Sequence, residues 1–311
     1  MKIKIISYHD LKHKNIFEKI EHALLQHGVV GVAHVPLFVE KSRSYIDAVR
    51  AFAALPDDVK KRYMPNRDQG DTEGYELGAE QFKNQQGVWQ VDDKKASYYA
   101  YIPDQPRNKW PLEVNLRTPF LELGDLIYHA GQLLLHALGL NESVGLKNEL
   151  LIGQARMLHY HKENDQTNFN PNWCGAHCDH GLFTGLIPAY YFQHGKEIDE
   201  PDEAGLYVAS ENNQFEKVHV PDQSILLFQV GEFAQLILND RIRATKHVVK
   251  KTKEGVERFT FALFYSVHDD VVIQSKSVLT HDGRYRQHQF ENGSISYGAW
   301  QNASLSIYRA R

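Results

Sequence analysis

The chain has 311 residues and a formal net charge of −4, from 35 Lys and Arg against 39 Asp and Glu. This balance gives no electrostatic argument for binding nucleic acid or an anionic membrane surface, so we expect neither as a partner. Hydrophobic residues make up 42% of the chain, which is enough to bury a substantial core in one large domain.

The two cysteines, Cys174 and Cys178, are too few for a disulfide framework. Their spacing without a second pair does not make a zinc site either. The N-terminus lacks the apolar stretch and the cleavage site of a secretory signal, and no window approaches the roughly 18 apolar residues of a membrane span. We therefore expect a cytoplasmic protein. The sequence does not indicate an oligomeric state.

The first part of the chain is expected to be largely helical. Apolar residues at helical spacing predict a helix over 11–27, and Gly28 ends it. A short buried strand over 29–35 and a second helix over 40–55 follow. Residues 65–111 are polar and rich in Gly, Asn, Gln and Asp, which is typical of an irregular segment with short strands that covers a site.

The clearest helix is predicted over 115–140, where apolar residues from Leu116 to Leu138 form one continuous stripe. After Gly153 the hydrophobic period changes to two. The expected strands cover 154–161, 182–193, 205–209, 217–220, 224–230, 234–238, 247–249 and 258–267. Short strands of this number and composition predict a mainly β jelly-roll core with a helical N-terminal part, an α+β arrangement.

The tripeptide His177-Cys178-Asp179 places an imidazole and a carboxylate two residues apart. In an extended segment both side chains point to the same face, so both can reach one ion. A histidine from another strand would complete a set of two His and one carboxylate with open positions opposite, as non-haem Fe(II) oxygenases require. The plainer alternative is a barrel that keeps His and Asp as a hydrogen-bonded pair without a metal.

The same pattern recurs at His268-Asp269-Asp270, and the residues that follow each copy distinguish them. His247 follows the first copy, and Arg258 and Thr260 come soon after at alternate positions of a predicted strand. A guanidinium beside a hydroxyl suits the distal carboxylate of a dicarboxylate ligand. The second copy has no such strand after it, so we reject it.

These residues give the chain a family resemblance. It resembles the isopenicillin N synthase-like branch of the 2-oxoglutarate/Fe(II)-dependent oxygenases, whose pattern is His-x-Asp, a distal His and Arg-x-Ser on a double-stranded β-helix. Further matches occur in the family's order: Gly28, Gly74-Tyr75, the stretch from Arg156 to Tyr160, Gly181, Thr184, Gly205, Pro221, Gly231 and Asn239. The resemblance implies an N-terminal dioxygenase-like segment over 1–112, packed on a core over 113–311 that holds the long helix and the jelly roll.

The resemblance also implies the site residues and the reaction. His177, Asp179 and His247 would bind Fe(II), and Arg258, Thr260 and Tyr160 would anchor the distal carboxylate of 2-oxoglutarate. In this family O2 reacts, CO2 and succinate leave, and a ferryl species oxidises the substrate, expected here to be a small molecule that the sequence does not identify.

Several positions depart from the family pattern. Gly231-Glu232 replaces Gly-Asp, Val248 replaces the arginine after the distal histidine, and Thr260 replaces serine but keeps the hydroxyl. A charged insertion near 193–203 is expected to be either a lid or a surface loop.

Two other functions stay open at this point. One is an oxidase that uses iron and O2 without 2-oxoglutarate, in which Arg258 and Thr260 hold the substrate's own carboxylate. The other is a non-catalytic barrel that binds a metal or a ligand. Five aromatic residues of the 65–111 segment either line a substrate pocket or only cap the barrel: Tyr75, Trp89, Tyr98, Tyr99 and Tyr101.

Overall fold

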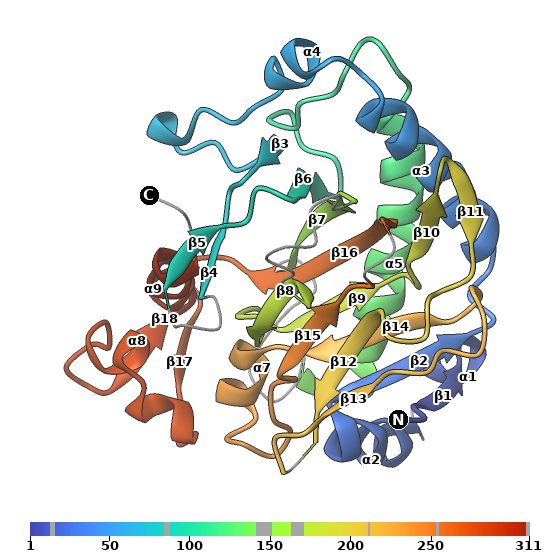
Figure 1. Cartoon of the computed structure of the whole chain (residues 1–311). Coiled ribbons are helices and arrows are strands. Elements are labelled where there is room, and N and C mark those ends of the chain that lie inside the picture. Colours follow the sequence, from blue (N-terminus) through green and yellow to red (C-terminus); the bar gives the residue numbers. More distant parts are fainter. Residues whose placement is uncertain are drawn as a thin grey trace.

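The computed structural model describes residues 1–12, 16–83, 88–140, 151–162, 171–210, 212–252 and 255–308. Two sheets face each other at its centre, and helices cover the outer side of the larger one (Figure 1). This is the expected strand-rich architecture with a helical N-terminal part. Among the described residues, no helix combines the length and the apolar character that crossing a membrane would need.

The larger sheet joins strands from both ends of the chain. Its order is β1 (Lys4–Ser7), β2 (Val29–Ala33), β14 (Leu226–Val230), β9 (Phe183–Leu186), β16 (Glu257–Val267), β7 (Leu151–Tyr160), β6 (Lys95–Ile102) and β3 (Gly74–Leu77). A hairpin of β10 (Tyr190–Gln193) and β11 (Lys196–Ile198) adds to β16. Because β2 and β6 pair directly with later strands, the N-terminal part shares this sheet with the core, and the division near residue 112 stays a prediction.

The smaller sheet is antiparallel and has the order β13 (Phe215–Lys217), β12 (Gly205–Ala209), β15 (His247–Lys250) and β8 (Asn172–His177). It lies in front of the larger sheet in Figure 1. Two antiparallel strand pairs stand outside both sheets: β4 (Gln81–Lys83) with β5 (Trp89–Val91), and β17 (Val272–Gln274) with β18 (Ser294–Ser296).

Most described helices flank the sheets. They are α1 (Tyr8–Leu11), α2 (Phe17–His27), α3 (Phe38–Ala53), α4 (Asp57–Lys61), α5 (Arg117–Ala137), α7 (Glu232–Ile237), α8 (Gly283–Arg286) and α9 (Tyr297–Tyr308), with the 3-10 turns η2 (Arg67–Gln69) and η4 (Val278–His281). The predicted helices over 11–27, 40–55 and 115–140 are confirmed as α2, α3 and α5, with ends shifted by a few residues.

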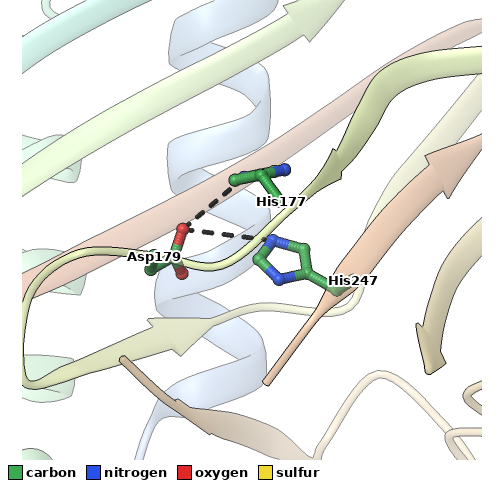
Figure 2. A group of neighbouring side chains, drawn as sticks. All are labelled: His177, Asp179 and His247. Atoms are coloured by element: carbon green, nitrogen blue, oxygen red, sulfur yellow. Dashed lines mark ion pairs between the residues drawn. The ribbon is translucent and has the colours of Figure 1, made fainter. Parts of the chain in front are cut away.

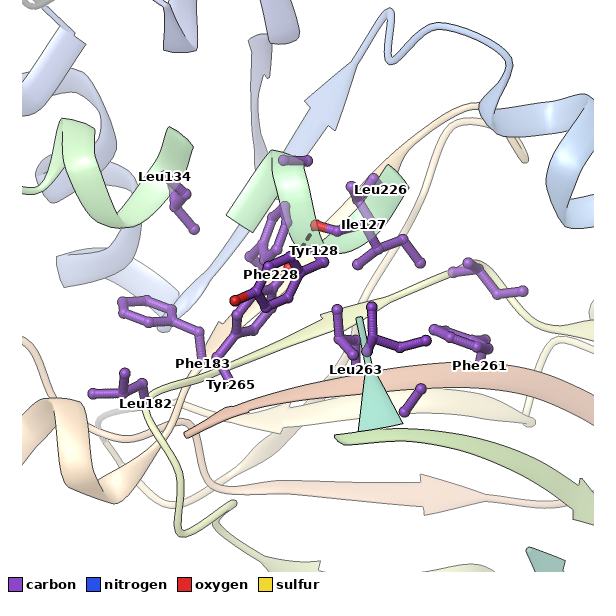
Figure 3. Close-up of a cluster of buried hydrophobic side chains, with 14 of the residues drawn as sticks. Ile127, Tyr128, Leu134, Leu182, Phe183, Leu226, Phe228, Phe261, Leu263 and Tyr265 are labelled. Carbon is purple, nitrogen blue, oxygen red and sulfur yellow. Dashed lines mark hydrogen bonds between the residues drawn. The ribbon is translucent and has the colours of Figure 1, made fainter. Parts of the chain in front are cut away.

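Helix α5 packs its apolar stripe on the larger sheet, as Figure 3 shows for Ile127, which is fully buried against the strands. The helix comes close because Gly131 has no side chain: a Cβ there would lie 2.2 Å from the ring of Tyr265. Each fully buried large apolar side chain contributes about 1.5–3 kcal/mol, so this stripe is a main source of stability. The sheet whose other face carries the site is thereby held rigid.

Three sequence predictions were wrong in detail. The strand predicted over 217–220 overlaps β13 only at Lys217, where β13 ends. Of residues 234–238, predicted as a strand, 234–237 belong to helix α7 and Leu238 is its C-cap. Short apolar runs do not distinguish strand from helix, and here Glu232 in the first turn favours the helix. The run predicted over 182–193 is two strands, β9 and β10, because Pro188 has no N–H to continue a ladder.

Candidate functional site

The antiparallel pairing of β8 and β15 places His177 directly opposite His247, with ring centroids 4.2 Å apart. Asp179 follows just beyond the end of β8 and turns toward both rings (Figure 2). Its Oδ1 lies 3.6 Å from His177 Nε2 and 4.0 Å from His247 Nε2. The three side chains each offer a ligand atom within 4.8 Å of the others, close enough to share one metal ion.

Both imidazoles are held so that Nε2 can act as a ligand. His177 Nδ1 lies 2.8 Å from the carbonyl of Gly175, and His247 Nδ1 lies 2.9 Å from the carbonyl of Thr245. A carbonyl only accepts, so each Nδ1 carries a hydrogen, and Nε2 is the nitrogen that would bind a metal ion in the neutral ring.

The carboxylate of Asp179 is fixed from its other oxygen. Oδ2 accepts hydrogen bonds from Thr184 Oγ1 and Gln229 Nε2, each at 2.5 Å. Burial alone would raise the pKa of Asp179, but the two imidazoles and these hydrogen bonds bring it below its usual value. Asp179 is therefore a charged carboxylate with Oδ1 facing the imidazoles.

The two imidazoles differ in protonation. Burial and the charge of His177 lower the pKa of His247 to about 4. Burial would also lower the pKa of His177, but the neighbouring Cys174 and Asp179 raise it to about 10. A divalent cation that binds at these nitrogens must displace the proton of His177.

Arg258 lines the same cavity as the His-Asp-His group. Arg258 is only 6% exposed, and its Nη1 is buried with no hydrogen-bond partner in the described part of the chain. A buried charged nitrogen without a hydrogen-bond partner is costly, so this guanidinium fits a ligand that brings a carboxylate.

Tyr160 and Thr260 lie beside Arg258 but are not equally available. The Tyr160 ring centroid is 5.1 Å from Arg258 Cζ, and burial raises the Tyr160 pKa to about 12, so the phenol keeps its hydrogen. Thr260 Oγ1 donates to the carbonyl of Ile187 at 3.0 Å. Its hydrogen must turn away from Ile187 before it can bond a carboxylate.

The structure adds residues that sequence reasoning did not assign. They are Gln229, which donates to Asp179, and Tyr191, whose hydroxyl lies 3.4 Å from Arg258 Nε. The period of two along β14 puts Gln229 on the cavity face and could have indicated it. No pattern within the sequence shows that β10 pairs with β16, so Tyr191 had no comparable signal.

The cavity has a volume of about 1270 Å³ and is lined by the His-Asp-His group, by Arg258 and by part of the 65–111 segment. It exceeds the ~300–1,000 Å³ of common small-molecule pockets, which leaves room for two ligands. The five aromatic residues divide: the cavity is lined by Trp89, Tyr99 and Tyr101, whereas Tyr75 and Tyr98 pack against Phe52 in the core.

One wall of the cavity carries a compensated charge network. Glu80 accepts from Lys95 at 2.6 Å and from Arg156 at 2.7 Å, and Lys95 also lies 3.1 Å from Asp92. Burial would raise the pKa of Glu80, but Arg156 and Lys95 keep it well below its usual value. This wall is polar and has two charges of each sign.

The departures from the family pattern have structural counterparts. Glu232 forms a bidentate ion pair with Arg284 on α8, with Nη1–Oε2 and Nη2–Oε1 distances of 2.6 and 2.9 Å. The charged insertion forms the β10–β11 hairpin, docked on α3 through Arg43 with Glu197 at 2.5 Å and Arg50 with the Gly195 carbonyl at 3.1 Å. The rejected His268 copy is exposed beyond the end of β16.

Two parts of the chain match known families. Residues 3–117 match the family described as the N-terminal region of non-haem dioxygenases in morphine synthesis. Residues 152–267 match the 2OG-Fe(II) oxygenase superfamily, and this range contains all of the predicted site residues.

Similar proteins agree with these matches. The chain is 26% identical to 1-aminocyclopropane-1-carboxylate oxidase homolog 2 of Arabidopsis thaliana over 83% of this chain, and spans 65% of that relative's length. It is 25% identical to homolog 7 over 94% of the chain and 83% of the relative.

Solved structures share the fold. A Caulobacter crescentus protein assigned to the 2OG-Fe(II) oxygenase family superposes with a TM-score of 0.73 at 20% identity, covering 98% of both chains. The dioxygenase for auxin oxidation 1 of Arabidopsis thaliana, solved with 2-oxoglutarate, gives 0.64 at 18% identity, covering 86% of this chain and 93% of that one. These neighbours have the double-stranded β-helix that the sequence predicted.

Proposed function

Since the chain belongs to the 2-oxoglutarate/Fe(II)-dependent oxygenase superfamily, we propose that it oxidises a small molecule with O2 as the oxidant and 2-oxoglutarate as the cosubstrate. One observation carries the proposal. A single cavity is lined both by the His-Asp-His group and by a buried arginine whose Nη1 has no hydrogen-bond partner among the described residues.

The donor set fits the metal. Two neutral imidazole nitrogens and one carboxylate are the ligands expected for non-haem Fe(II), and we assign them to His177, Asp179 and His247. Bound Fe(II) would supply the centre at which O2 and 2-oxoglutarate react, with succinate and CO2 as the products of the cosubstrate and an oxidised substrate as the other product.

The chain's own residues bind and orient the reactants. We assign the distal carboxylate of 2-oxoglutarate to Arg258, with Tyr160 and, after its hydrogen turns, Thr260 as further donors. Gln229 and Thr184 hold Asp179 so that one oxygen faces the two imidazoles. Apolar side chains such as Leu186 and Phe264 also line the cavity and would help to keep water from the reacting atoms.

The remaining cavity space accommodates the substrate beside Trp89, Tyr99 and Tyr101, facing the wall of Lys95 and Glu80. Aromatic faces together with paired charges suit a small polar molecule that has an apolar ring or chain.

The test is succinate formation from 2-oxoglutarate by the Fe(II)-loaded protein, including the slow turnover that occurs without a substrate. We expect succinate from the natural chain and none from Asp179→Ala. O2 consumption that does not need 2-oxoglutarate would instead support the oxidase alternative. Absence of both activities in fully metallated protein would contradict the proposal and favour a binding role.

A further inference from the structure

The strand pairing encloses Arg258 between two tyrosines. Arg258 on β16 is the register partner of Tyr160 on β7 and of Tyr191 on β10. From the smaller sheet, Trp173 on β8 reaches both tyrosine rings, with centroids 5.7 Å from Tyr160 and 6.2 Å from Tyr191. The guanidinium is thus held in an aromatic enclosure made by four strands.

Within this enclosure, Tyr191 is the described residue that accepts a hydrogen bond from the guanidinium of Arg258. Arg258 Nε donates to Tyr191 Oη at 3.4 Å, whereas Nη1 has no partner in the described part of the chain. A guanidinium anchored at Nε keeps one orientation, and its terminal nitrogens stay available for a carboxylate.

Glu200 fixes the direction of the hydrogen bond between Arg258 and Tyr191. Tyr191 Oη donates its only hydrogen to Glu200 Oε2 at 2.8 Å, so its lone pairs face Arg258. Glu200 is in turn paired with Lys217 at 2.8 Å. A Cβ at Gly205 would lie 2.9 Å from the Glu200 carboxyl group, so a larger residue there would displace it.

We propose that Tyr191 is a positioning residue for the cosubstrate: through its hydrogen bonds to Glu200 and Arg258, it orients the guanidinium toward the distal carboxylate of a 2-oxo dicarboxylate. This inference rests on the proposed function. It also assigns a role to the charged insertion, because the β10–β11 hairpin carries Tyr191 and the chain just after it carries Glu200.

Tyr191→Phe tests the proposal, and the neighbouring Tyr190→Phe is its matched control. Both tyrosines are buried on the same strand, but the Tyr190 hydroxyl has no hydrogen-bond partner among the described residues. Each variant loses one hydroxyl and keeps its ring.

The measurement is anaerobic calorimetric titration of the Fe(II)-loaded protein with two probes. One probe is 2-oxoglutarate. The other is 2-oxopentanoate, which has the same chain length and the same 2-oxo acid head but no distal carboxylate. We expect Tyr191→Phe to raise the Kd for 2-oxoglutarate ~10-fold, the usual size for a lost hydrogen bond to a charged group. The Kd for 2-oxopentanoate should change by less than about 2-fold, since that probe makes no bond to Arg258.

Further variants and outcomes make the test decisive. Tyr190→Phe should leave both Kd values unchanged, and Glu200→Gln, which keeps an oxygen acceptor for Tyr191, should retain most of the affinity for 2-oxoglutarate. Equal losses for both probes in Tyr191→Phe, or no loss for either, would overturn the positioning role. If the natural protein binds the two probes equally, Arg258 does not hold a distal carboxylate, and the proposed function itself fails.

Discussion

The orientation of Asp179 depends on side chains that bind no metal themselves. Gln229 and Thr184 hold Oδ2 at 2.5 Å, and Oδ1 consequently faces the two imidazoles. Groups that orient metal ligands in this way commonly contribute ~10–100-fold in metal affinity.

We therefore expect Gln229→Leu to weaken Fe(II) binding by ~10-fold or more, because Asp179 loses one of its two donors. Anaerobic metal titration measures this. Thr184→Ser should bind normally because it keeps the hydroxyl, and Gln214→Leu on the exposed β12–β13 turn serves as the surface control. Unchanged affinity in Gln229→Leu would show that Thr184 alone is sufficient.

Another residue-scale prediction concerns His159, which stacks on Phe259 with centroids 4.1 Å apart. Its Nε2 is buried and has no hydrogen-bond partner among the described residues. Burial, with the nearby His161 and Lys60, lowers the pKa of His159 to about 2. In the unfolded chain, the pKa of a histidine is ~6.5. As the pH falls, His159 therefore takes up a proton in the unfolded state but not in the folded state.

Stability from His159 is thus present above pH ~6.5 and is lost progressively below it. Between pH ~7 and pH ~5, we expect His159 to account for about 2 kcal/mol of lost unfolding free energy. Urea unfolding at several pH values should show a smaller loss in His159→Phe. The same pH dependence in both proteins would rule out His159 as the source.

Sequence reasoning was most successful where one strand sets the geometry. Arg258 and Thr260 share a face because they are two residues apart on one strand, and the spacing in His-x-Asp likewise predicted convergence. It failed for Tyr191 because that contact depends on the pairing of β10 with β16, which only the folded chain reveals.

At the scale of elements, the segment after β14 is held by the C-terminal part of the chain. Helix α7 begins at Glu232, whose carboxylate accepts two hydrogen bonds from Arg284 of α8. The guanidinium carbon of Arg284 also lies 4.4 Å from the ring centroid of Trp300 on α9. The backbone N–H of Glu232 donates to the carbonyl of Asp179 at 2.7 Å, which links this pair to the candidate metal site. The sequence predicted neither α7 nor this contact, because Arg284 lies 52 residues from Glu232.

Removal of Arg284 leaves the largely buried carboxyl group of Glu232 without its ion-pair partner. Arg284→Ala should therefore destabilise the fold by roughly 3–5 kcal/mol, the usual cost of breaking a buried pair on one side. Chemical denaturation measures the loss. Arg286→Ala, an exposed change on the same short helix, should have little effect, and the double variant Glu232→Gln/Arg284→Met should recover part of the stability.

At the scale of the whole molecule, the site lies between two sheets whose strands come from distant parts of the chain. The metal side chains belong to the smaller sheet and its extension, and Arg258 belongs to the larger one. A metal and a cosubstrate that together bridge the two sheets should therefore stabilise the folded state as a whole.

We expect 2-oxoglutarate to raise the Tm only when a divalent metal is present. At a concentration of ~100 times its Kd, a ligand adds about 2.7 kcal/mol, which corresponds to several degrees for a domain of this size. Thermal unfolding with and without Mn(II) measures the shift. Arg258→Met should keep the response to the metal and lose the response to 2-oxoglutarate, whereas equal shifts in both proteins would place the cosubstrate elsewhere.

The most direct measurement is an anaerobic crystal structure of the protein with Mn(II) and 2-oxoglutarate. We predict one ion bound by His177 Nε2, Asp179 Oδ1 and His247 Nε2, with the 2-oxo acid head on the ion and the distal carboxylate on Arg258. An ion bound by other side chains, or these three side chains turned away from a common centre, would contradict the account.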